Sequence, residues 1–472
     1  MTKVAIVGAG QTGASAALAL AERGVEVTLF SDRDQQSLRN DVPATGTAVL
    51  FGGGQEAERH LRLRSYQDVA PLGSGMSQRI VAEPDIELIA FDGTFDGFTA
   101  EGVDTRLKAD DRITGFRAIG GTFVARAVDE DALDEIAANH DLTLVATGRN
   151  GLRSLFPRDE ARSVLASPQR NVIMLTVTGL GHDKSVFAHR SPAGGAHSAF
   201  SFIGEKGEAW WGPYYHKDVG PSWSFLGWAK PGSEWETRFA AAVSAESALQ
   251  IVADLHRDYL PWDLPEVLRF EVIPQDPHSW LKGAVTQEVR SSVGWTKSGH
   301  VVASLGDTAI SFDPLAGQGA QSGLIQTALY VDRIVGRDGA LDERWIRESF
   351  DIFYTQRGAG AELVTRLFLG HPDLAEIAQI LIAAANGSER FADRLFGLIS
   401  DPSPLLALRT PDDVKAFVTR FSGEDVDDVL ARSADRVARA QDAHKLGLPY
   451  FARSKLPGDR RYSQTKLKES VA

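Results

Sequence analysis

Hydrophobic residues near the start of the chain follow a strand–helix–strand order. Residues 4–7 form a short apolar run that predicts a buried strand, and residues 25–30 form a second one. Residues 14–23, between them, are rich in alanine and predict a helix. Two further strands are predicted at the starts of segments 142–148 and 301–307, and a helical pattern covers residues 320–334. This order predicts an α/β fold.

The middle and the end of the chain have other patterns. Residues 200–228 alternate as a sheet does, and a helix is expected near residues 233–259. The apolar run 377–385 predicts a buried helix within a largely helical region. The predicted parts are a discontinuous first domain at 1–165 and 286–345, an inserted β-sheet domain at 166–285, a C-terminal helical region at 346–425, and a charged helix with a basic tail at 426–472.

A glycine motif follows the first predicted strand. Gly8, Gly10 and Gly13 have the G-x-G-x-x-G spacing between a strand and a helix. In this context the first glycine permits a tight turn, the second lets the backbone approach a pyrophosphate, and the third lets the helix pack on the strand. The helix N-terminus then faces the phosphates. We therefore predict a Rossmann-type dinucleotide site; a bare structural turn is the alternative.

The end of the second strand departs from the usual pattern. An acidic residue is expected there to bind the ribose hydroxyls, but the position holds Ser31, with Asp32 and Arg33 after it. A neutral hydroxyl makes a weaker hydrogen bond than a carboxylate. These three residues are the candidate contacts to the adenosine end. Either Asp32 replaces the missing acid, or it only caps the loop and the adenosine is held less firmly.

Composition narrows the class of protein. The 472 residues include 50 basic and 63 acidic side chains, a net charge of −13, so nucleic acid and anionic membranes are poor partners over a broad face. The chain has no cysteine, which fits a reducing compartment and leaves no thiolate metal site. No apolar run approaches the ~20 residues of a membrane span. We expect a cytoplasmic protein without a metal, because the spacing of His189, His197 and His216 matches no metal site.

A second set of motifs points to a flavin. The motifs are a Thr-Gly pair and a Gly-Asp pair, each after a strand, and a proline- and glycine-rich turn before a helix: Thr147-Gly148, Gly306-Asp307 and residues 313–319. This order resembles flavoprotein monooxygenases of the aromatic-hydroxylase superfamily. The resemblance implies that Asp307 binds the ribityl chain of FAD. It also implies that the helix N-terminus stabilises negative charge on the reduced ring, with backbone amides near its pyrimidine end at Gly317, Gln318 and Gly319.

Further stretches are similar to the styrene and indole monooxygenases. These are residues 103–107, 146–149, 168–170 and 306–319, and the resemblance runs from residue 1 to about 425. It implies a two-component system in which a separate NAD(P)H-dependent reductase supplies reduced FAD. The oxygenase then forms a flavin C4a-hydroperoxide with O2 and epoxidises or hydroxylates an aromatic alkene or an indole-like ring. It also implies that Arg106, Thr147 and Gly148 contact the cofactor, and a homodimer is the expected assembly.

The resemblance also implies an apolar cleft beside the flavin, because the cofactor carries the hard chemistry. Pro314 and Leu315, before the flavin-facing helix, and Thr45 and Thr47, after the second strand, are the candidate catalytic-pocket residues. Segment 200–228 is rich in aromatic residues, among them Phe200, Phe202, Trp210, Trp211, Tyr214, Tyr215, Trp223 and Trp228. They form either a sheet core or, for one or two of them, the lining of the substrate pocket.

Two other functions stay open at this stage. A self-sufficient hydroxylase would reduce its own FAD with NAD(P)H, but Thr147 stands where such enzymes usually carry aspartate. A non-catalytic Rossmann-type binding protein would have no need of the motif around Asp307. The sequence therefore favours the two-component oxygenase.

Overall fold

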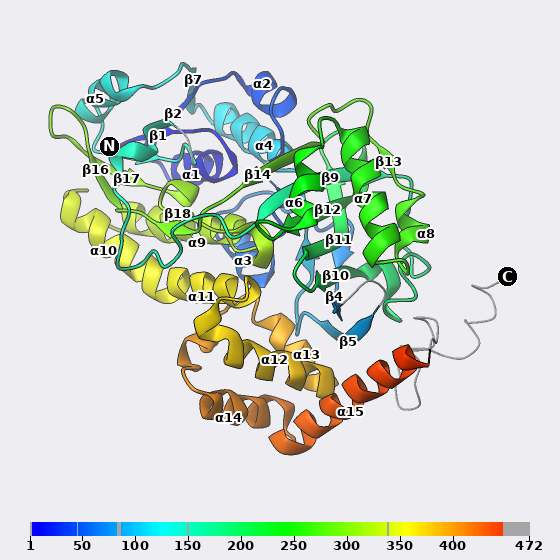
Figure 1. Cartoon of the computed structure of the whole chain (residues 1–472). Coiled ribbons are helices and arrows are strands. Elements are labelled where there is room, and N and C mark those ends of the chain that lie inside the picture. The colour runs from blue at the N-terminus through cyan, green and yellow to red at the C-terminus, as the bar shows by residue number, and fades with distance from the viewer. Residues whose placement is uncertain (1, 45, 83–85, 149–150, 338, 447–472) are drawn as a thin grey trace.

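The computed structural model describes residues 2–44, 46–82, 86–148, 151–337 and 339–446 (Figure 1). Two sheets organise this part of the chain, and helices from the C-terminal third contact strands of both. The α/β class and the helical C-terminal part are confirmed.

The first sheet has six strands in the order β16-β17-β8-β1-β2-β7. Neighbouring strands are parallel except at one edge, where β16 is antiparallel to β17. The strands are β1 (Lys3–Val7), β2 (Glu26–Ser31), β7 (Thr122–Ala125), β8 (Leu142–Val145), β16 (Val293–Trp295) and β17 (Val301–Ser304). The predicted apolar runs are thus the central strands, which are largely buried because helices cover both faces.

Three helices cover one face of this sheet, and a shorter one covers the other. They are α1 (Gln11–Glu22), α4 (Thr105–Ala118) and α9 (Gly319–Val335) on the first face, and α5 (Glu130–Ala138) on the second. Two further helices, α2 (Gln35–Asn40) and α3 (Gly52–His60), lie between β2 and the second sheet in sequence, and α3 packs on α9. α1 begins after a short turn that follows β1, whereas α9 follows β17 through a longer connection, residues 305–318.

The second sheet has eight strands, of which seven follow the order β13-β9-β12-β11-β10-β4-β5, while β14 pairs with β9. They are β4 (Gly75–Val81), β5 (Glu87–Thr94), β9 (Asn171–Thr178), β10 (His197–Ile203), β11 (Gly207–His216), β12 (Gly220–Ala229), β13 (Glu271–Val272) and β14 (Trp280–Ala284). Two short pairs, β3 (Leu72–Gly73) with β6 (Ala100–Glu101) and β15 (Glu288–Val289) with β18 (Ile310–Ser311), complete the strands.

Two expectations about this region need correction. Residues 75–94 were expected in the first domain, but β4 and β5 belong to the second sheet, because β4 pairs in parallel with β10, far along the chain. The helix expected near 233–259 is two helices, α6 (Glu234–Ala240) and α7 (Ala245–Tyr259). Ser244 separates them, since its side chain caps α7 in a capping box with Ser247. A short helix, α8 (Leu264–Val267), follows.

The C-terminal third is helical, as predicted (Figure 1). Its helices are α10 (Glu343–Phe353), α11 (Ala359–Phe368), α12 (Ala375–Gly387), α13 (Glu389–Gly397), α14 (Pro411–Ser422) and α15 (Val426–Lys445). A π-helical turn, Tyr354–Gly358, joins α10 to α11. Gly93 lets α13 approach β5 closely, since a Cβ at this position would lie only 2.8 Å from the backbone of Ala392. The expected basic tail lies outside the described residues.

Among the residues that the structure describes, no single helix is long and apolar enough to cross a membrane. One pair of helical segments, Glu343–Phe368 and Pro372–Gly387, passes that test by length and composition only, with a 95° bend at the break.

Candidate active site

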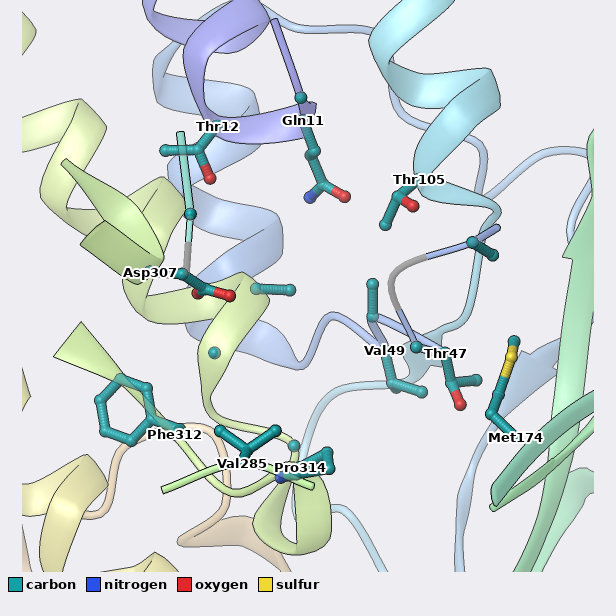
Figure 2. A pocket seen from close by; sticks show the side chains of 18 of the residues that line it. Gln11, Thr12, Thr47, Val49, Thr105, Met174, Val285, Asp307, Phe312 and Pro314 are labelled. Carbon is teal, nitrogen blue, oxygen red and sulfur yellow. The ribbon is translucent and has the colours of Figure 1, made fainter. Parts of the chain in front are cut away.

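One cavity of about 880 Å³ is lined by residues from both sheets. From the first sheet it receives the segments that follow β1, β2, β8 and β17, where parallel strands present their carboxyl ends. From the second sheet it receives side chains of β4, β9, β10, β11 and β12. Figure 2 shows Asp307 and Thr12 on one side of this space and Met174 with Thr47 on the other. Ligands in open α/β sheets bind at this carboxyl edge.

The glycine turn after β1 forms one end of the cavity. Gly8 has φ +112°, and a Cβ there would lie 2.3 Å from the carbonyl oxygen of Ala146, so no other residue fits. A Cβ at Gly13 would lie 1.9 Å from the Gly8 carbonyl oxygen, which shows how closely α1 packs on the turn. Gly10 lines the cavity and has open space where a Cβ would stand. Of the three glycines of the motif, Gly10 is therefore the one whose Cβ position opens into free space.

The N-terminus of α1 carries no cap of its own. Gly10 is the N-cap residue, no side chain caps the helix, and its first turn has no acidic residue. Gln11 also lines the cavity, and its buried side-chain oxygen has no hydrogen-bond partner among the described residues. Unsatisfied N–H groups and the positive end of a helix dipole attract a phosphate. This end of the cavity fits a pyrophosphate.

A buried ion network supports that turn from below. Arg112 donates a hydrogen bond to the backbone oxygen of Gln11 at 3.2 Å and pairs with Glu58. Lys108 lies 2.8 Å from Glu58 and 2.7 Å from Glu101. All four charged side chains are fully buried. Sequence reasoning missed this network, because its members come from α3, α4 and β6 and no local pattern connects them.

The end of β2 brings to the cavity two of the three residues that the sequence proposed for the adenosine. Ser31 and Asp32 line the cavity after β2, and the Ser31 hydroxyl accepts a hydrogen bond from the Arg33 backbone. The Asp32 side chain is 67% exposed and lies 3.7 Å from Arg33. Arg33 itself does not line the cavity. Asp32, the acidic side chain nearest to the expected position, is thus solvated, and water competes for its hydrogen bonds.

A second helix N-terminus faces the cavity. The segment after β17 runs through Asp307 and a short turn, Pro314–Ala316, to Gly317, whose φ of 63° is left-handed. α9 begins after Gln318 and has neither a side-chain cap nor an acidic residue in its first turn. Gly317 and Gly319 line the cavity, whereas the Gln318 side chain is buried behind them. The arrangement offers backbone N–H groups and a positive dipole to an electron-rich ring.

Asp313 lies just before this turn and is fully buried. Its Oδ1 accepts a hydrogen bond from the Leu315 backbone at 3.0 Å, and its Oδ2 has no partner among the described residues. Burial raises the pKa of the Asp313 carboxyl to about 7, against the opposing effects of the Leu315 N–H and the Arg170 guanidinium. The nearby Glu208 raises it further. Pro314 and Leu315, which line the cavity, therefore follow a carboxyl group that keeps its proton up to neutral pH.

The far end of the cavity is apolar. Met174 is buried on β9, and Phe200, Trp210 and Trp228 add three aromatic rings from segment 200–228. The other apolar lining side chains in this part include Met76, Val172, Leu226, Leu281 and Phe368. Trp211 and Trp223 instead pack in a separate core with Phe270. Some of these rings thus form a core, whereas three line the cavity, more than the one or two expected; contact with a substrate stays a prediction.

Polar groups at this end are few. Thr47 lines the cavity, and its hydroxyl lies 3.2 Å from that of Ser224. Lys282 also lines it, but its ammonium group donates to the backbone oxygens of Ala240 and Ala242, at 2.6 and 2.7 Å. Thr45, the other candidate from this loop, lies outside the described residues. We call the part of the cavity around Met174, Phe200, Leu226 and Trp228 the apolar lobe.

Arg106 does not reach the cavity. Its guanidinium pairs with Asp104 at 2.8 Å and with Asp276 at 2.6 Å, and His216 lies 2.8 Å from Asp276. These groups are buried, and they join the start of α4 to segments of the second sheet. Burial lowers the pKa of Arg106, but the hydrogen bonds and charges of the two carboxylates together outweigh it and raise the pKa above its ordinary range. The expected contact between Arg106 and the cofactor is therefore wrong, and Arg106 has a structural role instead.

The structure thus brings most of the predicted site residues to one cavity. Those that line it are Gly8, Gly10, Ser31, Asp32, Thr47, Thr147, Gly148, Asp307, Pro314, Leu315, Gly317 and Gly319. Gly13 and Gln318 lie behind the wall, and Arg33 and Arg106 lie elsewhere. Sequence reasoning missed Met76, Phe368 and Ile399, which reach the cavity from β4 and the C-terminal part. Over the described residues, no group of His, Asp or Glu side chains could hold a metal ion.

Comparisons with known proteins agree with this geometry. Residues 148–265 match the family profile of the styrene monooxygenase A substrate-binding domain, and residues 3–179 match that of the FAD-dependent oxidoreductases. No curated protein matches the chain. The cofactor of this chain is FAD, and the glycine cradle at Gly10 and the two uncapped helix N-termini fit it.

Solved structures share the fold at low sequence identity. The tetrameric form of 2-methyl-3-hydroxypyridine-5-carboxylic acid oxygenase has a TM-score of 0.56 at 14% identity, covering 80% of this chain and 93% of that one. The flavin-dependent brominase Bmp2 has a TM-score of 0.58 at 14% identity, covering 89% and 99%. A variant of the halogenase PltM in complex with FAD has a TM-score of 0.56 at 14% identity, covering 96% and 94%.

Substitutions at two glycines should separate binding from folding. Gly10→Val places a side chain in open cavity space at an ordinary φ of −66°. We expect FAD affinity to fall roughly 10–100-fold, because hydrogen bonds to a charged phosphate contribute ~1.5–3 kcal/mol, with the melting temperature of the apoprotein unchanged. Gly13→Ala should instead lower that melting temperature. Fluorescence titration and thermal unfolding measure both; equal FAD affinity in Gly10→Val and wild type would contradict the placement of the cofactor.

Asp313 should make folding stability depend on pH. Because its pKa of about 7 in the folded state lies above the unfolded value, wild type loses stability as pH rises from about 4 to about 7. The isosteric Asp313→Asn does not titrate. The unfolding free energy of wild type relative to Asp313→Asn should therefore fall over this window, by at most ~1.4 kcal/mol per pH unit, and level off above it. Urea unfolding between pH 4.5 and 8 measures this difference, and a difference independent of pH would show that the carboxyl is ionised throughout.

Proposed function

We propose that this chain, a styrene/indole monooxygenase-like FAD flavoprotein, is the oxygenase component of a two-component FAD-dependent monooxygenase. It is a monooxygenase, and its place in a two-component system and its substrate class are our proposal. In this proposal a separate NAD(P)H-dependent flavin reductase supplies reduced FAD. The substrate is a small aromatic alkene or an indole-like ring, which is epoxidised or hydroxylated with molecular oxygen.

A single observation carries the proposal. One continuous cavity joins the glycine turn and the two uncapped helix N-termini to the apolar lobe. A cofactor with a pyrophosphate at one end and a reactive ring at the other can therefore bind at the first sheet and meet an apolar substrate at the second. Proximity of this kind is the main contribution that a protein makes when the cofactor carries the chemistry.

Each part of the lining has a proposed role. The N–H groups at Gly10 and α1 bind the pyrophosphate, Ser31 and Asp32 hold the adenosine end, and Asp307 holds the ribityl chain. Thr147 and Gly148 lie against the cofactor between these parts, and the amides of Gly317 and Gly319 bind the pyrimidine end of the ring. Bound reduced FAD supplies the electrons that activate oxygen.

The apolar lobe has two proposed roles: it orients the substrate and excludes water. Pro314, Leu315 and Thr47 lie beside the reacting part of the ring in this proposal. Met174 and the aromatic side chains would hold a neutral ring, because burying a charge among apolar groups is costly. Excluding water also keeps the activated oxygen from being lost before it reaches the substrate.

Two sequence features support an external source of electrons. Thr147, which lines the cavity, stands where self-sufficient hydroxylases usually carry aspartate. The adenosine end has a hydroxyl at Ser31 and a solvated Asp32 in place of a buried acid, which suits a flavin that binds and leaves. A self-sufficient NAD(P)H-dependent hydroxylase is the alternative. The homodimer and the cytoplasmic location stay predictions.

The source of electrons is testable with the purified chain. With FAD, NADH, NADPH, oxygen and styrene or indole, we expect no product above background; adding any flavin reductase that releases reduced FAD should start oxygenation. Product analysis and oxygen consumption measure this. Styrene or indole oxygenation at full rate without a reductase would contradict the two-component assignment and favour the self-sufficient enzyme.

The apolar lobe is testable at Met174. Met174→Gln buries an amide of similar size without a partner, which costs ~1–3 kcal/mol, so kcat/KM for an apolar aromatic substrate should fall about tenfold or more. Met174→Leu keeps an apolar side chain and should retain most of the activity. Both variants should bind FAD as wild type does. If Met174→Gln and Met174→Leu behave alike, the lobe does not contact the substrate.

A further inference from the structure

The buried arginines of this chain have carboxylate partners, with one exception. Six arginines are buried among the described residues. Five of them lie within 4.0 Å of an Asp or Glu side chain: Arg79, Arg106, Arg112, Arg170 and Arg190. The sixth, Arg357, forms no ion pair with any described residue, although its side chain is as deeply buried as theirs. A buried charge without a counter-charge is costly, so this one calls for an explanation.

Arg357 is held by neutral oxygens only. Its guanidinium donates to the backbone oxygen of Ser400 at 2.7 Å and to the side-chain oxygen of Gln318 at 2.5 Å. Its Nε has no partner among the described residues. Burial lowers the pKa of Arg357 to about 10, against an opposing effect of the Asp401 charge. The side chain is therefore positively charged at neutral pH.

This cation lies directly behind the cavity wall. Gln318 is the N-cap residue of α9, and its amide nitrogen donates to the backbone oxygens of Ala316 and Ile399, at 2.8 and 3.1 Å. Gly317, Gly319 and Ile399 line the cavity. Arg357 thus fixes the amide orientation of Gln318, which in turn fixes the left-handed turn at Gly317. The arginine comes from the π-helical turn Tyr354–Gly358, and such turns occur frequently at functional sites.

We propose that Arg357 is a positioning residue for the cofactor: it fixes the Gly317–Gly319 turn through Gln318, and its charge makes the cavity favour reduced, anionic FAD over oxidised FAD. The inference rests on the proposed function, in which the chain takes up FAD that was reduced elsewhere. Oxidised flavin is neutral at the ring, whereas reduced flavin carries a negative charge there. The anion would be the partner that Arg357 lacks, and the dipole of α9 acts with the same sign.

The test compares the affinities of the two redox states of FAD. Dissociation constants are measured for oxidised FAD in air and for photoreduced FAD under anaerobic conditions, on the full chain and its variants. Wild type should bind reduced FAD more tightly. In Arg357→Gln the ratio of the two constants should shift about tenfold toward oxidised FAD, because a charge behind the wall acts through a moderate effective dielectric. This equals a fall of about 30 mV in the potential of the bound two-electron couple.

Two further variants separate charge from structure. Arg357→Lys keeps the charge and should keep most of the preference for reduced FAD, even if both affinities fall. Arg366→Gln removes a charge on α11 that lies 3.7 Å from Glu362, and should leave the ratio unchanged. If the turn were only a structural element, Arg357→Gln and Arg357→Lys would weaken both redox states equally.

Each outcome decides the inference. An unchanged ratio in Arg357→Gln overturns it, and so does a wild-type protein that binds both redox states equally, a result that needs no variant to fold. A failure of the proposed function appears elsewhere, as styrene or indole oxygenation with NADH or NADPH and no reductase. The two failures are therefore distinguishable.

Discussion

The site depends on two helix N-termini that open onto one cavity without side-chain caps. α1 and α9 begin at the carboxyl edge of the parallel strands of the first sheet, and neither has an acidic residue in its first turn. Their N–H groups are satisfied only by water or by a ligand. The positive ends of both dipoles therefore point at the space where FAD has its own negative charges, at the pyrophosphate and, when reduced, at the ring.

The surrounding structure holds these two ends in place. Beneath α1, the buried charges of Glu58, Lys108 and Arg112 fix the turn through the Gln11 backbone. Beneath α9, Arg357 and Gln318 do the same for Gly317. Breaking buried networks of this kind by removing one partner is strongly destabilising. The second sheet then adds what the first lacks, an apolar lobe around Met174 that suits a neutral ring and excludes water.

Local patterns in the sequence predicted the parts of the site that are local in structure. The glycine turn, the central strands and the Gly306-Asp307 segment each combine a short apolar run with a glycine whose conformation is demanding, as at Gly8. The contributions of β4 and of the C-terminal part were not predictable, because they depend on long-range pairing and packing. Arg106 illustrates the limit: the family resemblance implied that it contacts the cofactor, but two buried carboxylates, Asp104 and Asp276, hold it elsewhere.

The central claim is that this chain performs oxygenation on FAD that it did not reduce. A single-turnover experiment tests it most directly: the purified chain is loaded anaerobically with photoreduced FAD and an aromatic alkene, with no nicotinamide and no reductase present, and is then mixed with oxygenated buffer. Because one cavity joins the cofactor end to the apolar lobe, we predict close to one molecule of oxygenated product per bound FAD. Reoxidation of the flavin that yields only hydrogen peroxide, across a panel of aromatic alkenes and indoles, would contradict the claim.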